Sequence, residues 1–268
     1  MSRTVSGAYA KVEAARNSAR PTGIDYISNV FSSFIELHGD RRGGDDPSLV
    51  GGLAYLERQP VTVLAIEKGH TAKQRQARSF GSVHPEGYRK ALRLMRQAQK
   101  FHRPVICLVD TAGAGCGLAD EQHGIGQAIA ENLTELAGLS VPVISILISE
   151  GGSGGALALA LTDEVWMLKG AYYSVISPEG CAQILWKDPA RTSEAAACLH
   201  LTADDALKLK VADRIIPETD LGKKPFYDNL RGSLASELER LGKDPELTEK
   251  RYARFRRFGD FAADDGAF

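Results

Sequence analysis

The sequence predicts an α/β fold whose strands are mostly parallel. Pro60, Pro104 and Pro142 each precede a short apolar run of the kind that forms a buried strand. Each run leads to a glycine-bearing loop and then to a helix-forming segment, in the first case after a basic stretch. Because alternating strands and helices build parallel sheets, the loops that follow these strands should gather at one end of the sheet.

Composition narrows the class of protein. The chain has 268 residues, 43% hydrophobic and 25% charged, with a formal net charge of −1. This near-neutral balance gives no reason to expect nucleic acid or an anionic membrane as a partner. The sequence has no apolar targeting segment and no apolar run of membrane-spanning length, so we expect a cytoplasmic protein.

Cysteine usage argues against a metal site on this chain. The four cysteines are scattered and form no Cys-x-x-Cys pair, which excludes a zinc ribbon, and a chain this long does not need a disulfide framework. We therefore expect buried, reduced thiols and no metal. The four are Cys107, Cys116, Cys181 and Cys198.

The first part of the chain divides into five segments. Residues 1–23 are polar and alanine-rich, which suggests an arm with one helix. Mixed apolar spacing over Ile27–Leu37 predicts a helix, and glycine, aspartate and arginine over His38–Pro47 predict a loop. The runs Leu49–Leu56 and Val61–Ile66 predict a β-hairpin.

A basic segment follows the hairpin. It contains Lys68, His70, Lys73, Arg75 and Arg78. Such a cluster is commonly a solvated loop. Lysine and arginine are also the usual partners of phosphate, so a phosphate-contacting loop stays open as the second interpretation.

The middle of the chain carries the clearest periodicity. Apolar residues at helical spacing predict an amphipathic helix over Pro85–Phe101, with the proline in its first turn. Val105–Val109 predicts a buried strand that opens into a glycine-rich loop, Asp110–Gly117. A second helix is predicted from Ile125 to about Gly138.

The last third predicts shorter elements. Strands are expected over 165–168, 173–176 and 211–216, and helices over 182–186, 195–199, 203–210, 227–241 and 249–258. We divide the chain into an N-terminal arm (1–23), one α/β domain (24–226) and a C-terminal helical segment (227–268).

The stretch Gly151-Gly152-Ser153-Gly154-Gly155 stands at the end of the apolar run 141–149 and before an Ala/Leu-rich segment. Glycine amides at a strand-to-helix turn favour an anionic group. A P-loop is excluded because Ala156, not lysine, follows Gly155. The other glycine loop matches a dinucleotide fingerprint only weakly, because its third glycine, Gly117, comes one position early.

Three interpretations of this stretch stay open. Gly-x-Ser-x-Gly is the pattern of a nucleophile elbow, with Ser153 as nucleophile, His200 as base and Asp163 or Asp188 as the acid. The glycines could instead serve close packing of a helix on a strand. The third interpretation is that the amides of Gly151 and Gly152 stabilise an oxyanion or enolate without a side-chain nucleophile.

Several blocks resemble the α subunit of bacterial acetyl-CoA carboxylase carboxyltransferase. The similarity extends from about Ile24 to Pro217. Its blocks are Val50–Gly52, Phe80-Gly81, Pro85–Met95, Asp110-Thr111, Glu150–Ala158, Tyr173–Ala182 and Ile215–Glu218.

The resemblance implies a crotonase-like (ClpP/crotonase) fold of stacked ββα units and an α2β2 assembly with a zinc-bearing β subunit. It implies transfer of a carboxyl group from carboxybiotin, held on the biotin carboxyl carrier protein, to acetyl-CoA, which gives malonyl-CoA for fatty-acid synthesis. An ATP-dependent biotin carboxylase belongs to the wider complex. The transfer needs no protein base, because the biotin nitrogen itself takes the proton from acetyl-CoA.

The resemblance also assigns residues. Gly151 and Gly152 hold the ureido oxygen of biotin, amides of the β subunit hold the thioester oxygen, and Ser153 is structural, as a helix cap. Lys68, Lys73, Arg75 and Arg78 are our candidates for contacts with CoA phosphates or with the partner subunit.

The chain departs from the family pattern beside the site. The family's Asp-Thr-Pro-Gly-Ala-Tyr-Pro-Gly loop becomes Asp110–Gly117 without its prolines and aromatic residue, and Glu-Arg-Gly-Gln becomes Gln122–Ile125. These changes leave open a subunit with weakened catalysis or a changed acyl-CoA preference.

Overall fold

The computed structural model describes residues 7–259, and the expectations for residues 1–6 and 260–268 lie outside it. One eight-stranded sheet forms the framework, in the order β1-β2-β3-β4-β5-β6-β8, with β7 paired to the far end of β5. The strands are β1 (Ser32–Glu36), β2 (Leu49–Leu56), β3 (Gln59–Ile66), β4 (Val105–Thr111), β5 (Val143–Gly152), β6 (Glu164–Leu168), β7 (Tyr172–Ser174) and β8 (Arg214–Ile216).

The first three strands are antiparallel, and every later pairing in the sheet is parallel. Every residue of β4 and β5 is buried, as the continuous apolar runs predict. The predicted α/β class and its parallel sheet are therefore confirmed, and the loops after β4 and β5 open at the same end of the sheet.

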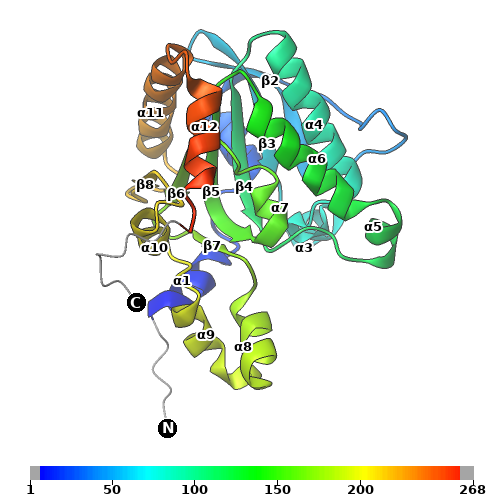
Figure 1. Ribbon diagram of the computed structural model, residues 1–268, viewed down its shortest axis with the longest axis vertical. Coiled ribbons are helices and arrows are strands. Elements are labelled where there is room, and N and C mark those ends of the chain that lie inside the picture. The colour runs from blue at the N-terminus through cyan, green and yellow to red at the C-terminus, as the bar shows by residue number, and fades with distance from the viewer. Residues whose placement is uncertain (1–6, 260–268) are drawn as a thin grey trace.

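Helices cover the sheet, and Figure 1 shows α4 and α6 side by side over it. In the same view α1, α8 and α9 gather at the end of the molecule where β7 lies. The helices are α1 (Gly7–Ala15), α2 (Gly23–Val30), α3 (Ala72–Ala77), α4 (Pro85–Lys100), α5 (Leu118–Gln122), α6 (Ile125–Gly138), α7 (Ser153–Leu157), α8 (Pro178–Trp186), α9 (Thr192–Cys198), α10 (Ala203–Lys208), α11 (Lys224–Gly242) and α12 (Leu247–Arg256).

The prediction of a helix over Ile27–Leu37 is wrong for the second half of that range. The helix α2 ends at Val30, and Ser32–Glu36 pairs with β2 as an edge strand. A Cβ on Gly52 would overlap the backbone of Ile35, so the glycine leaves room for this strand. Main-chain pairing at an edge leaves little trace in side-chain periodicity.

One short helix lies where a solvated loop was expected, and another begins earlier than predicted. Thr71 and Gln74 form a capping box that starts α3 inside the basic segment, a signal that the Thr-x-x-Gln spacing carried. The Ser177 hydroxyl accepts a hydrogen bond from the Gly180 amide at 3.1 Å, so α8 starts at Pro178, before the predicted 182. The thiols also differ from expectation, because Cys116, in the loop before α5, and Cys198, at the end of α9, are exposed, and only Cys107 and Cys181 are buried.

The C-terminal helices pack on the sheet domain. Arg251 of α12 is fully buried and pairs with Asp163 at 2.7 Å. Its guanidinium also donates to the carbonyls of Leu136, Leu139 and Val141, where α6 ends and β5 approaches. No helix among residues 7–259 has the length and apolar character needed to cross a bilayer.

Replacing Arg251 with lysine is expected to lower the free energy of unfolding by about 2 kcal/mol. A lysine keeps the charge but cannot reproduce the planar fork, so buried carbonyls lose their donors. Urea denaturation of the full chain measures this, with Arg256→Lys on the exposed side of α12 as the matched control. Equal stability of the two variants would contradict the anchoring role.

Candidate functional site

The two glycine loops meet where β4 and β5 end. Thr111 lies opposite Gly151 in the parallel ladder. A Cβ on Gly152 would overlap the carbonyl of Ala112, and one on Gly155 would come within 2.5 Å of the Ala114 nitrogen. The loops approach so closely that side chains at these positions would push them apart.

The glycine-rich stretch therefore serves close packing, one of the three interpretations of the sequence. Gly151 lies opposite Tyr173 of β7 and Gly152 opposite Ser174, so both belong to the sheet as well as to the loop. The side of the loops that leaves room for a ligand lies at Gly113 and Gly154 instead. A Cβ on Gly113 would meet nothing within 4 Å, and one on Gly154 would meet only Ile129, at 3.9 Å. The assignment of oxyanion binding to the amides of Gly151 and Gly152 stays a prediction.

The serine hydrolase centred on Ser153 is not assembled. Ser153 has a φ of +54°, but its supposed base, His200, is exposed and lies 3.8 Å from Asp205. Of the two candidate acids, Asp163 binds Arg251, and Asp188 accepts from the Ala190 amide. Ser153 does not cap its helix either, because Gly152 occupies the N-cap position without a side-chain bond.

A buried ion cluster braces the ends of β4 and β5. The ammonium nitrogen of Lys68 lies 2.5 Å from Glu150 and 2.7 Å from Asp110, and all three side chains are at most 10% exposed. Asp110 also accepts from the Glu150 amide at 3.1 Å. Each glycine loop thus begins at a carboxylate held by the same lysine.

This geometry differs from the expectation for Lys68. Its ammonium is enclosed by two carboxylates and does not face solvent, so it organises the site instead of meeting a phosphate. Burial opposes its charge, but Asp110 and Glu150 raise the pKa of Lys68 above the usual value.

The N-terminal arm completes the cluster. Arg16, just after α1, donates to Glu150 at 3.1 Å and pairs with Glu179 of α8 at 2.7 Å. The Tyr172 hydroxyl donates to Glu150 at 2.6 Å. Nothing in the local pattern of the polar arm predicted that Arg16 reaches the site, because that contact arises from tertiary packing.

Acid should weaken this cluster at Glu150. Burial alone would raise the pKa of Glu150, but Lys68, Tyr172 and Arg16 lower it below the usual 4.5. A depressed pKa contributes stability that is present above pH 4.5 and is lost as the pH falls through the folded-state value. Below pH 4.5, wild type should therefore lose stability more steeply than Glu150→Gln, as urea denaturation across pH would show. Parallel curves would contradict this role.

The other basic candidates lie on α3 or next to it. Lys73 is exposed, whereas the guanidinium groups of Arg75 and Arg78 donate to the carbonyls of Gly69 and Pro47 at 3.3 and 2.5 Å. Contact of these three residues with phosphate or a partner subunit stays a prediction.

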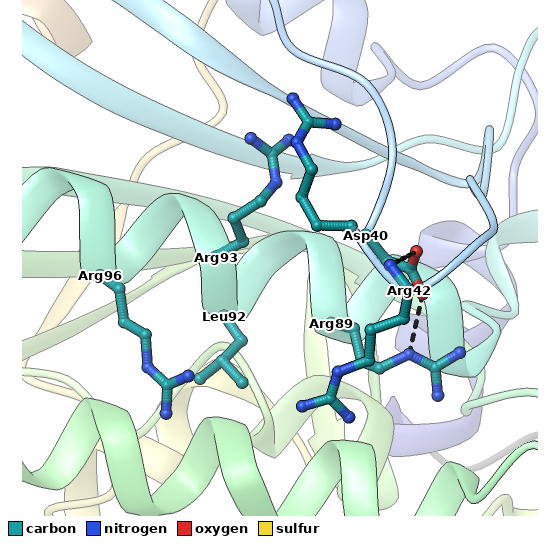
Figure 2. A pocket seen from close by; sticks show the side chains of 7 residues that line it. Asp40, Arg42, Arg89, Leu92, Arg93 and Arg96 are labelled. Atoms are coloured by element: carbon teal, nitrogen blue, oxygen red, sulfur yellow. Dashed lines mark hydrogen bonds and ion pairs between the residues drawn. The ribbon is translucent and has the colours of Figure 1, made fainter.

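The structure contains another concentration of positive charge, which no sequence pattern indicated. A cavity of about 230 Å³ is lined by Asp40, Leu92 and five arginines: Arg41, Arg42, Arg89, Arg93 and Arg96. Figure 2 shows Arg89 reaching Asp40, and the two lie 2.9 Å apart. Arg41 and Arg93 both donate to the carbonyl of His38. The arginines come from α4 and from the loop 38–47, so only the tertiary structure brings them together.

A family model described as acetyl co-enzyme A carboxylase carboxyltransferase-like matches residues 6–259. The chain belongs to this carboxyltransferase family. An acetyl-coenzyme A carboxylase carboxyl transferase subunit alpha from Ruminiclostridium cellulolyticum is 55% identical over 254 residues, which cover 94% of this chain and 98% of the relative. The resemblance seen in the sequence blocks is therefore confirmed.

A second relative and a solved structure are also similar to this chain. A relative from Natranaerobius thermophilus, named as subunits beta/alpha, is 49% identical over 259 residues, which cover 94% of this chain and 43% of the relative. The structure of a Pseudomonas malonate decarboxylase hetero-tetramer in complex with coenzyme A matches with a TM-score of 0.71 at 20% identity, covering 90% of this chain and 99% of that chain. This likeness shows the fold, and the predicted crotonase-like class is confirmed.

Proposed function

We propose that the chain is the α subunit of an acetyl-CoA carboxylase carboxyltransferase. In this role it moves a carboxyl group from carboxybiotin, held on the biotin carboxyl carrier protein, to acetyl-CoA. The product, malonyl-CoA, starts fatty-acid biosynthesis. The observation that carries the proposal is the match of the family model to residues 6–259, together with a 55% identical relative that bears this name.

The geometry of the glycine loops suits a flat ring. Gly113 leaves open space over the backbone, and a Cβ on Gly154 would meet only Ile129 at ordinary contact distance, so the ureido ring of biotin has room to approach the loop. In the proposed site the amides of Gly151 and Gly152 bind the ureido oxygen and orient the ring. Carboxybiotin supplies the carboxyl group. The Lys68–Asp110–Glu150 cluster keeps both loops in place, and no side-chain base from this chain is needed.

The rest of the site is proposed to lie on a β subunit. The relative named as subunits beta/alpha supports a close partnership, because one polypeptide there carries both. Apolar side chains also remain exposed beside and on α8, with Val175 at 76%, Ile184 at 70% and Leu185 at 60%. Large apolar side chains exposed on one short segment suit an interaction surface. In this proposal the β subunit carries the zinc, the assembly is α2β2, and a biotin carboxylase completes the complex.

Transfer in the reverse direction tests the proposal. The chain and a β subunit are mixed with malonyl-CoA and free biotin as carboxyl acceptor, and loss of malonyl-CoA is followed. We expect biotin-dependent consumption only when both chains are present. Consumption by this chain alone, or none with a β subunit bound to it, would contradict the proposal.

A further inference from the structure

A serine, a histidine and an aspartate lie in line beside the glycine loops. The hydroxyl oxygen of Ser79 is 2.8 Å from Nε2 of His84, and Nδ1 of His84 is 2.5 Å from Asp120. This is the order of contacts in a catalytic triad, in which an acid orients a base that activates a hydroxyl. The three residues come from the turn Ser79–Gly81, the start of α4 and helix α5.

His84 and Asp120 are each held in place by another hydrogen bond. The His84 amide donates to Asp46 at 2.7 Å, at the N-cap of α4. Asp120 is buried and accepts from the Gly117 amide at 2.9 Å. Because an ionised carboxylate can only accept, Nδ1 of His84 carries a proton, and in the neutral imidazole Nε2 accepts from Ser79.

The serine lies in an unusual backbone conformation. Ser79 and Phe80 have φ of +47° and +54°, in the left-handed region that side chains disfavour. Gly81 follows at +81°, and a Cβ there would lie 2.7 Å from Lys68 Cγ and 2.9 Å from the Asp110 carbonyl oxygen. The turn is thus packed on the buried ion cluster, and strain of this kind gathers at functional sites.

The triad is open to solvent. The side chain of His84 is 37% exposed, and Ser79 is partly exposed. Phe80 and Leu118, near Ser79 and Asp120 in the chain, are exposed large apolar residues that an acyl group could contact. Burial opposes the charge of His84, but Asp120, Asp46 and Glu86 raise its pKa above the usual 6.5.

We propose that Ser79 is a nucleophile toward activated acyl esters and thioesters, with His84 as its base and Asp120 as the orienting acid. The oxygen of Ser79 bonds to the acyl carbon while its proton passes to Nε2 of His84. The leaving thiolate or alkoxide takes that proton. Water then attacks the acyl-serine through the same base, releasing the carboxylic acid and restoring the serine hydroxyl. The activity needs no cofactor and is separate from carboxyl transfer.

A fluorophosphonate probe tests this on the full chain, alone and bound to a β subunit. The probe phosphonylates an activated serine with loss of fluoride, and peptide mass spectrometry locates the adduct. We expect the adduct on Ser79, its loss in Ser79→Ala and at least about 100-fold slower labelling in His84→Gln. Labelling of wild type should accelerate as the pH rises through the raised pKa of His84. Release of nitrophenol from p-nitrophenyl acetate should change in parallel.

The matched control is Ser153→Ala, which removes another serine with a positive φ and should label as wild type does. Circular dichroism confirms that each variant is folded. Absence of an adduct on Ser79 in folded wild type would overturn the proposal. Labelling that survives Ser79→Ala would also overturn it, because the reactive serine would then lie elsewhere.

Discussion

Replacing Lys68 with methionine should lower the free energy of unfolding of the chain by about 3–5 kcal/mol. The methionine fills a similar volume, but it leaves Asp110 and Glu150 facing one another in a buried site. Arg16 and Tyr172 still contact Glu150, whereas Asp110 loses its only ion-pair partner among residues 7–259. Two buried carboxylates that share one site repel each other, and one of them must take up a proton. Urea denaturation at pH 7 measures the loss.

The matched control is Lys73→Met, which removes the same group from an exposed position in the same segment. Its effect should stay within about 0.5 kcal/mol, as for most surface substitutions. If the two variants lose the same stability, or if Lys68→Met loses less than about 1 kcal/mol, the cluster does not brace the loops.

The second large effect is expected from one methyl group at the meeting point of the glycine loops. Gly152→Ala places a Cβ on the carbonyl of Ala112, which is backbone and cannot rotate away, so one loop must move. A displacement of about 1 Å in a positioning loop costs on the order of 100-fold in rate. We expect at least that loss in malonyl-CoA formation by the chain assembled with a β subunit.

Gly154→Ala is the control within the same loop, because a Cβ there meets only the Ile129 side chain, at ordinary contact distance. It should assemble like wild type and keep its rate within a few-fold. Equal rates for Gly152→Ala and wild type would contradict the close-packed geometry.

Local pattern predicted most of the framework. The apolar runs before Gly113 and Gly151 became the buried strands β4 and β5, and the periodicity after Pro85 became α4. These elements were predictable because the hydrophobic pattern of a buried parallel strand or an amphipathic helix reflects which of its residues are buried. The edge strand β1 was missed because its pairing depends on the backbone of β2 more than on its own side chains.

The site was predictable only in part, for a related reason. The glycine stretch is recognisable in the sequence as part of a site. The role of Lys68 is not, because its partners Asp110 and Glu150 lie 42 and 82 residues away in the chain. The roles of Arg16 and of the line of Ser79, His84 and Asp120 could not be predicted either. These roles depend on tertiary contacts between residues that no local pattern distinguishes. The sequence pattern around Ser153 pointed to a nucleophile, yet the contacts that activate a serine occur at Ser79.

Forward carboxyl transfer tests whether this chain supplies half of the active site. Biotin carboxyl carrier protein charged with labelled carboxybiotin is mixed with acetyl-CoA and with this chain, a β subunit or both, and labelled malonyl-CoA is counted. We predict label in malonyl-CoA only when both chains are present, with Gly152→Ala at least about 100-fold slower. Label transferred by a β subunit alone, or no transfer by a complex that has formed, would contradict the assignment of half of the active site to this chain.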